Sequence, residues 1–160
     1  MNRTHFARRT APAFSLALSL ILAIVARAAH AQDGPQPKLQ TTPLIAGMHV
    51  IQAELAVTEA QQMVGMMFRR EMGPNDGMLF VNDTPGVRCF WMHNTLLPLS
   101  IAFIADDGSI VNIDEMAAQT DTSHCSAKAV RFALEMSQGW FARHGIKAGF
   151  KLRGAPFGTR

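Results

Sequence analysis

The chain of 160 residues has no tyrosine, two tryptophans and only two cysteines. Neither cysteine belongs to a C-x-x-C motif, which argues against redox catalysis. The sequence also lacks the G-x-S-x-G, H-E-x-x-H and S-x-x-K motifs of common hydrolases, and no segment repeats at a fixed period. Because no catalytic motif is present, the function must be inferred from the composition and from residue patterns that are less specific than such motifs.

The first 31 residues contain no acidic side chain. Arginines near the start precede an apolar run, residues 14–25, that is too short to span a membrane comfortably, and Ala29 and Ala31 form a small-x-small cleavage signal. This pattern predicts a secretory signal peptide, residues 1–31, that is cleaved between Ala31 and Gln32. An uncleaved membrane anchor is the alternative.

Removal of the predicted signal peptide changes the charge balance. The whole chain has 15 Lys and Arg residues against 12 Asp and Glu residues, and four of the basic residues precede Gln32, which leaves 11 against 12. The basic precursor therefore gives no reason to expect a nucleic-acid partner. We expect a periplasmic or secreted protein that meets the membrane only during export. The Sec route is favoured, because the residues after Arg8 and Arg9 continue a twin-arginine motif poorly.

Cys89 and Cys125 both lie in the predicted exported part. An oxidising compartment makes them a disulfide candidate, and a loop of this length would contribute roughly 4 kcal/mol in the chain-entropy view. Two free thiols are the alternative, because the sequence does not give the distance between them.

The part after the signal peptide is long enough for one domain with a core of its own. Residues 32–47 are rich in Gln, Pro and Thr and predict a flexible lead-in. Residues 48–155 then predict a single β-rich domain.

Short apolar runs separated by Gly, Pro and Asp turns predict a mainly β fold. The expected strands are residues 51–57, 78–81, 87–92, 99–105, 109–113 and 130–136. Thr58 and Gln61 match a capping box that opens a helix over residues 58–70, with Gly65 in its interior, where another backbone is expected to pack closely. The spacings leave little room for crossover helices. We therefore predict a jelly-roll-like sandwich or barrel of short, mostly antiparallel strands with one packed α-helix.

The order of several motifs resembles one known family. They are Glu54-Leu55-Ala56, Gly65-Met66-Met67-Phe68-Arg69, Asp76-Gly77-Met78-Leu79-Phe80, Phe90-Trp91-Met92-His93-Asn94-Thr95, Pro98-Leu99, Ala102-Phe103-Ile104, Asp107-Gly108, Leu134-Glu135 and Gly139. The series is similar to the domain of unknown function 192 over roughly residues 49–152. This resemblance implies a small β-rich domain, often exported by bacteria, without an established activity. The family commonly has Lys at the position of His93 and Asp at the position of Ser100, so Ser100 is not expected to be catalytic.

The polar residues at these family-like positions suggest a binding pocket. The candidates are Glu54, Arg69, Asp76, Trp91, His93 and Asn94. Arg69 is expected to pair with Glu54 or Asp76. We expect a non-catalytic module that binds an unknown small ligand or an envelope protein, without a cofactor.

Two other functions remain open. In the first, His93 is the base of a small hydrolase or transferase, oriented by Asp76, Glu54 or Glu135, with Thr95 or Ser100 as the nucleophile. In the second, Met92 and His93 bind Cu(I) or Ag(I) together with neighbouring methionines, although strand alternation would place Met92 opposite His93. A third interpretation, the structural reading, is that Asn94 and Thr95 stabilise a sharp corner by hydrogen bonds with their own backbone.

Overall fold

The structure, a computed structural model, describes residues 34–157. The predicted signal peptide and its cleavage between Ala31 and Gln32 lie outside these residues. In chain order the elements are β1 (Thr41–Ala46), β2 (His49–Ala56), α1 (Glu59–Val64), β3 (Asp76–Gly86), β4 (Cys89–Phe90), β5 (Leu99–Ile104), β6 (Ile110–Met116), β7 (His124–Cys125), β8 (Val130–Ser137) and α2 (Trp140–Arg143).

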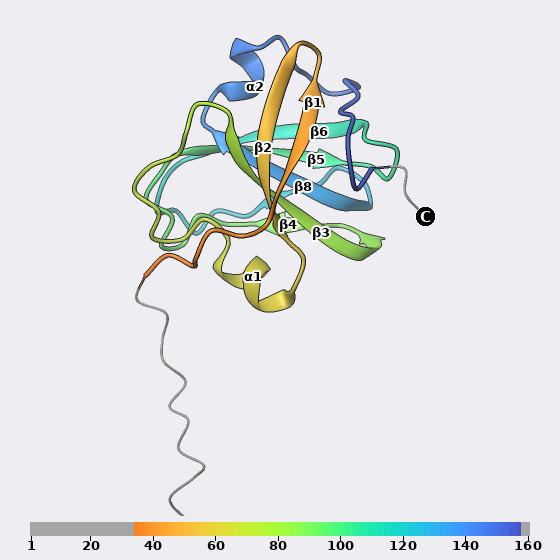
Figure 1. The fold of residues 1–160 in the computed structure, drawn as a ribbon. Helices are drawn as coiled ribbons and strands as arrows, with labels where there is room; N and C mark the ends of the chain where they lie inside the picture. Colours follow the sequence, from red (N-terminus) through yellow and green to blue (C-terminus); the bar gives the residue numbers. More distant parts are fainter. Residues whose placement is uncertain (1–33, 158–160) are drawn as a thin grey trace, which may run out of the picture. The chain divides into compact units, whose positions relative to one another are not determined.

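Six strands form one sheet in the order β1-β2-β3-β8-β5-β6, and β4 and β7 form a separate two-stranded ribbon. Figure 1 shows the β1–β2 hairpin passing in front of β5, β6 and β8. Isolated bridges join Ile45 to Arg153 and Ser109 to Lys151, so the C-terminal segment links β1 to the β5–β6 turn. The mainly β, mostly antiparallel class predicted from the sequence is confirmed.

The pairing of β2 with β3 departs from the prediction, because these two strands are parallel. The chain between them includes α1 and returns to the same end of the sheet, as a parallel connection requires. The crossover runs from the end of β2 at Ala56 to the start of β3 at Asp76, although the spacings in the sequence had argued against crossover connections. Met66 of this connection lies in one buried cluster with Ala56 of β2 and Met78 of β3.

The predicted helix is shorter than expected. The capping box at Thr58 and Gln61 is present, but α1 ends at Val64 instead of continuing to residue 70. Gly65 lies at the C-cap with φ of 49°, and a Cβ there would be 3.2 Å from the Phe80 ring, so the glycine is needed for its backbone angle and for a nearby side chain rather than for a packed backbone. Within residues 34–157, no helix has the length and apolar character that a membrane crossing requires.

Two other boundaries also differ from expectation. The lead-in predicted over residues 32–47 contains β1, which pairs with β2 along its whole length, so a flexible segment to residue 47 is wrong. The strand predicted over residues 87–92 is reduced to Cys89–Phe90. β4 pairs with β7, which is distant in sequence, whereas β1 pairs with the adjacent β2 across a turn at Gly47 and Met48.

The sheet is covered on both faces. On one face, the cross-strand neighbours Leu79, Leu134 and Ala102 lie in one buried cluster. Trp140 and Phe141 of α2 belong to the same cluster. The opposite face carries the second cluster, which is rich in methionine; its methionines are Met66, Met78, Met92 and Met116. Both faces are therefore interior surfaces, and an ionisable group on either face must be accommodated away from bulk water.

The disulfide between Cys89 and Cys125 is present, with 4.1 Å between the two Cα atoms. The two cysteines are direct cross-strand partners in the β4–β7 ribbon. Each strand of this ribbon has only two residues, so the covalent bond supports a pairing that has few hydrogen bonds of its own.

Candidate functional site

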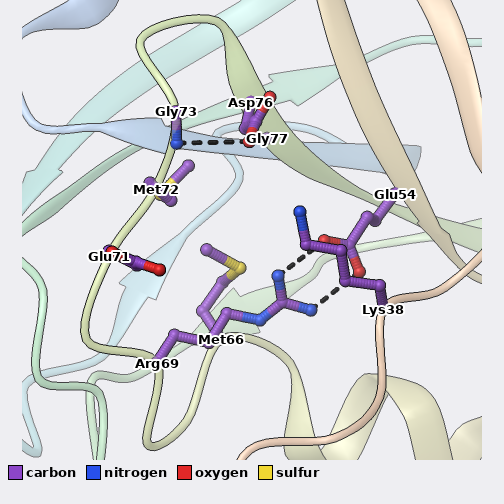
Figure 2. A pocket seen from close by; sticks show the side chains of 9 residues that line it. All are labelled: Lys38, Glu54, Met66, Arg69, Glu71, Met72, Gly73, Asp76 and Gly77. Atoms are coloured by element: carbon purple, nitrogen blue, oxygen red, sulfur yellow. Dashed lines mark hydrogen bonds and ion pairs between the residues drawn. The ribbon is translucent and has the colours of Figure 1, made fainter.

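A pocket of about 320 Å³ opens beside β2 and β3. It is lined by Lys38, Glu54, Met66, Arg69, Glu71, Met72, Gly73, Asp76 and Gly77. Figure 2 shows the Glu71, Met66 and Met72 side chains around one space, with the Arg69 guanidinium beside the Glu54 carboxylate. The volume lies at the lower end of the range for small-molecule sites.

The parallel pair β2–β3 forms the base of this pocket, and the α1–β3 connection forms much of its wall. The Gln52 N–H donates to the Asn75 carbonyl at 2.9 Å, which fixes the start of β3 beside β2. A side chain at either of two lining glycines would disturb the pocket, by displacing the Asp76 carboxylate at Gly73 and by meeting backbone at Gly77. A Cβ on Gly73 would be 2.6 Å from the Asp76 carboxylate, and one on Gly77 would be 2.7 Å from the Glu135 carbonyl oxygen.

Glu54 and Arg69 form a bidentate ion pair at one side of the pocket. Arg69 Nη1 lies 2.5 Å from Glu54 Oε1, and Nη2 lies 2.7 Å from Oε2, with both side chains almost entirely buried. The Leu39 N–H also donates to Oε2 at 2.8 Å. Burial by itself raises the pKa of Glu54, but the hydrogen bonds from Arg69 and Leu39 and the nearby positive charges outweigh it, and the pKa is lowered. This carboxylate is therefore held in its charged form.

The other charged groups of the pocket leave it with a negative balance. Arg69 neutralises Glu54, so the remaining charges are the cation Lys38 and the carboxylates Glu71 and Asp76. Among residues 34–157, neither of these two carboxylates takes part in a salt bridge. Asp76 Oδ2 accepts only the Gly73 N–H, at 3.2 Å.

Glu135 is a second buried carboxyl on the same face of the sheet as Glu54. In register, Glu54 lies opposite Met78, and Met78 lies opposite Glu135 on the next strand. Glu135 is 4% exposed, and its Oε2 has no hydrogen-bond partner among the described residues. Burial raises the pKa of Glu135 to about 8, so its carboxyl group is mostly protonated at neutral pH.

The six pocket candidates from the sequence separate into two groups. Glu54, Arg69 and Asp76 line the same pocket, and the expected pairing of Arg69 is made with Glu54. The other three candidates, Trp91, His93 and Asn94, are exposed in the loop between β4 and β5 and do not line it. A backbone hydrogen bond of 2.9 Å from Phe68 N–H to the Asn94 carbonyl connects this loop to the pocket wall.

His93 has a different partner from those expected. Its ring stacks on Trp91 with 5.0 Å between centroids, and its Nδ1 lies 3.0 Å from Asp121 Oδ1, so Asp76, Glu54 and Glu135 do not orient it. The proposed nucleophiles are also engaged elsewhere. The Thr95 hydroxyl donates to the His93 carbonyl, and the fully buried Ser100 hydroxyl contacts the Glu115 carboxylate.

The structure also separates the two proposed metal ligands. The Met92 side chain is fully buried in the methionine-rich cluster, whereas that of His93 is about half exposed. Asn94 has φ of 53°, and the Thr95 N–H donates to the Met92 carbonyl at 3.0 Å, which is the corner that the structural reading describes. Within the described part of the chain, no three His, Cys, Asp or Glu side chains gather as a metal site.

Several lining residues were not identified from the sequence. Lys38 lies in the segment expected to be a flexible lead-in, and Glu71 follows the predicted helix without a motif around it. Met66 belongs to a family-like motif, and Met72 was expected only among the neighbouring methionines of a metal site. The proline and glycines of the turn at residues 73–77 were the available signal for a wall at this place.

The pattern of the domain of unknown function 192 (DUF192), a family described as an uncharacterized ACR, matches residues 42–154. The chain belongs to the DUF192 family. Two similar solved structures have the same fold. A protein from Sinorhizobium meliloti 1021, described as a candidate transcription regulator, is 34% identical, with a TM-score of 0.71 over 75% of this chain and 98% of that one.

A protein of unknown function from Novosphingobium aromaticivorans DSM 12444 is 37% identical, with a TM-score of 0.70 over 75% of this DUF192 chain and 91% of that one. No curated protein matches the chain. The resemblance seen in the sequence motifs is thus confirmed at the level of family and fold.

Proposed function

We propose that this DUF192 protein is an exported, non-catalytic ligand-binding module of the cell envelope, and that the pocket beside β2 and β3 binds a small organic cation. The observation that carries the proposal is the charge arrangement of the pocket. Arg69 is already neutralised by Glu54. Lys38 offsets only one of the two remaining carboxylates, Glu71 and Asp76, neither of which forms a salt bridge among the described residues. A ligand amine or quaternary ammonium would supply the missing positive charge.

The apolar part of such a ligand has a matching surface. Met66 and Met72 line the pocket, and methionine side chains adapt to irregular apolar groups because they are unbranched and flexible. A pocket of about 320 Å³ suits a molecule of a few carbon atoms rather than a polymer.

Export is supported by two observations. The N-terminal sequence has the features of a signal peptide, and the Cys89–Cys125 disulfide is typical of proteins that fold in an oxidising compartment. The regulatory role described for the Sinorhizobium relative suggests nucleic acid as an alternative partner. We do not extend it to this chain, because the part after residue 31 has 11 basic and 12 acidic residues.

Calorimetric titration with butylammonium, tetramethylammonium and butyrate tests the proposal. We expect the two cations to bind and butyrate not to bind. Asp76→Asn should weaken cation binding about tenfold, which corresponds to about 1.4 kcal/mol. Asp121→Asn is the matched control, because it removes one carboxylate from the surface loop instead. Equal binding of butyrate, or an equal effect of the two variants, would contradict the proposal.

The natural ligand and the export step are checked in one further measurement. Native mass spectrometry of the protein isolated from its own envelope fraction should show a mass that lacks residues 1–31 and carries an additional small molecule. A full-length mass would exclude the cleavage between Ala31 and Gln32.

A further inference from the structure

His49, Trp140 and His144 form a ring cluster that is separate from the pocket lining. His49 is the first residue of β2, and His144 follows the last residue of α2. The two imidazole centroids are 4.2 Å apart, and the His144 centroid is 4.3 Å from that of Trp140. Both imidazoles are partly exposed, whereas Trp140 is buried. Two histidines distant in sequence thus lie side by side at the surface, on a fixed aromatic base.

One hydrogen bond determines which nitrogen of His144 is free. Its Nδ1 lies 2.7 Å from the Trp140 carbonyl oxygen, and because a carbonyl only accepts, Nδ1 must carry the proton. In the neutral ring, Nε2 then has its lone pair available. Metal-binding histidines commonly have this arrangement, in which a backbone carbonyl orients the ring and fixes its tautomer. Among residues 34–157, the His49 ring makes only ring contacts, so it is able to turn toward a shared ion.

The separation of the rings suits two adjacent positions on one metal ion. A bond from a metal to an imidazole nitrogen is about 2 Å long, and two imidazoles at a right angle around the metal have centroids roughly 4.5 Å apart. The observed separation of 4.2 Å is close to this value. Adjacent nitrogen ligands in a square plane, with water in the other positions, are typical of Cu(II), which also binds nitrogen donors most strongly among the common divalent metals.

We propose that His49 and His144 form a surface site for Cu(II). The site is independent of the pocket and of the Met92 and His93 pair, and it uses two imidazoles where a structural metal site would have three or four protein ligands. The nearest charged side chain in α2 does not occupy it, because the Arg143 guanidinium donates to the Gln138 carbonyl at 2.8 Å.

The test uses tryptophan fluorescence of the disulfide-bonded protein during titration with aqueous Cu(II) in a buffer that does not bind metal. Trp91→Phe leaves Trp140 as the single tryptophan, next to the proposed site. We expect saturable quenching at one equivalent of Cu(II). His49→Ala and His144→Ala should each weaken it on the order of tenfold or more, because a single imidazole loses the chelate. His93→Ala is the matched control and should leave it unchanged.

Electron paramagnetic resonance of the Trp91→Phe protein with one equivalent of Cu(II) requires no change at either proposed ligand. The expected spectrum is tetragonal, with coupling to two imidazole nitrogens. Folding of each histidine variant is checked by circular dichroism, so that a loss of binding is separated from a loss of structure. Quenching that survives both His49→Ala and His144→Ala, or that disappears in His93→Ala, would overturn the assignment, as would a spectrum without nitrogen coupling.

Discussion

Glu54 and Glu135 are two buried carboxyl groups on the same face of one sheet, yet they differ in charge. Glu54 has a bidentate partner in Arg69, and its pKa is lowered. Glu135 lies two strands away, behind Met78, with its Oε2 unpartnered among the described residues, and its pKa is raised to about 8. Burial is common to both, so the presence of a partner decides which of them is ionised.

This difference has a functional meaning. The charged pair gives the pocket a fixed polar wall, whereas the neutral carboxyl keeps the adjacent methionine-rich core free of charge. A face with two unpaired carboxylates would be much less stable, because each buried charge without a partner costs several kcal/mol.

Arg69→Met should have the largest effect on this comparison. It would leave the charged Glu54 buried without its partner, and we expect a loss of about 3–5 kcal/mol in the free energy of unfolding at pH 7, measured with urea. The double variant Glu54→Gln, Arg69→Met should recover most of this loss, because no buried charge remains. A cost below about 1 kcal/mol for the single change would mean that water reaches Glu54.

Glu135→Gln should change the pH dependence of stability. The pKa of Glu135 rises from an ordinary value of 4.5 in the unfolded chain to about 8 in the folded protein, so its contribution is complete below pH 4.5 and decreases as the pH rises toward 8. The loss is a few kcal/mol, and the Gln variant should lack it. The measurement is urea unfolding from pH 4 to pH 9, with the exposed Glu59→Gln as control. Parallel profiles for wild type and Glu135→Gln would show that Glu135 titrates normally.

The smallest effect is expected for an ion pair at the surface. His93 and Asp121 lie as close together as many buried pairs, but their side chains are 49% and 71% exposed. His93→Ala should therefore change the free energy of unfolding by less than about 1 kcal/mol in thermal or urea denaturation. A loss comparable to that of Arg69→Met would indicate that the loop, and not only the pair, depends on His93.

The parts of the fold that follow from local chemistry were predictable. Asp106, Asp107 and Gly108 specify a tight turn between the strands expected over residues 99–105 and 109–113, and the β5–β6 hairpin forms around it. In contrast, the Gln, Pro and Thr content of residues 32–47 predicts a lead-in, but Leu44, Ile45 and Ala46 pair with β2 as part of a strand. At the helix end, Gly65 has a positive φ, and a Cβ there would also approach the ring of Phe80, a residue distant in sequence.

The site was predictable only in part, for the same reason. Glu54, Arg69 and Asp76 were expected in one pocket because they occupy family-like positions on nearby elements, and they line it together. Trp91, His93 and Asn94 were predicted in the same pocket only because their side chains are suited to binding, and side-chain chemistry does not show how far apart residues lie. The state of Glu135 depends on which side chains cover its face of the sheet, and no local pattern reports this.

The segment before β1 has a practical consequence for anyone who shortens this protein. The family match begins at residue 42, but the Gln36 side chain is anchored to the Gln61 and Gly65 carbonyls, and Leu39 donates its N–H to Glu54. A fragment cut at the family boundary would keep the six strands of the main sheet, apart from Thr41 at the start of β1, but would lose Lys38 from the pocket. The smallest piece suitable for a binding assay therefore starts before Gln36, outside the conventional limits of the domain.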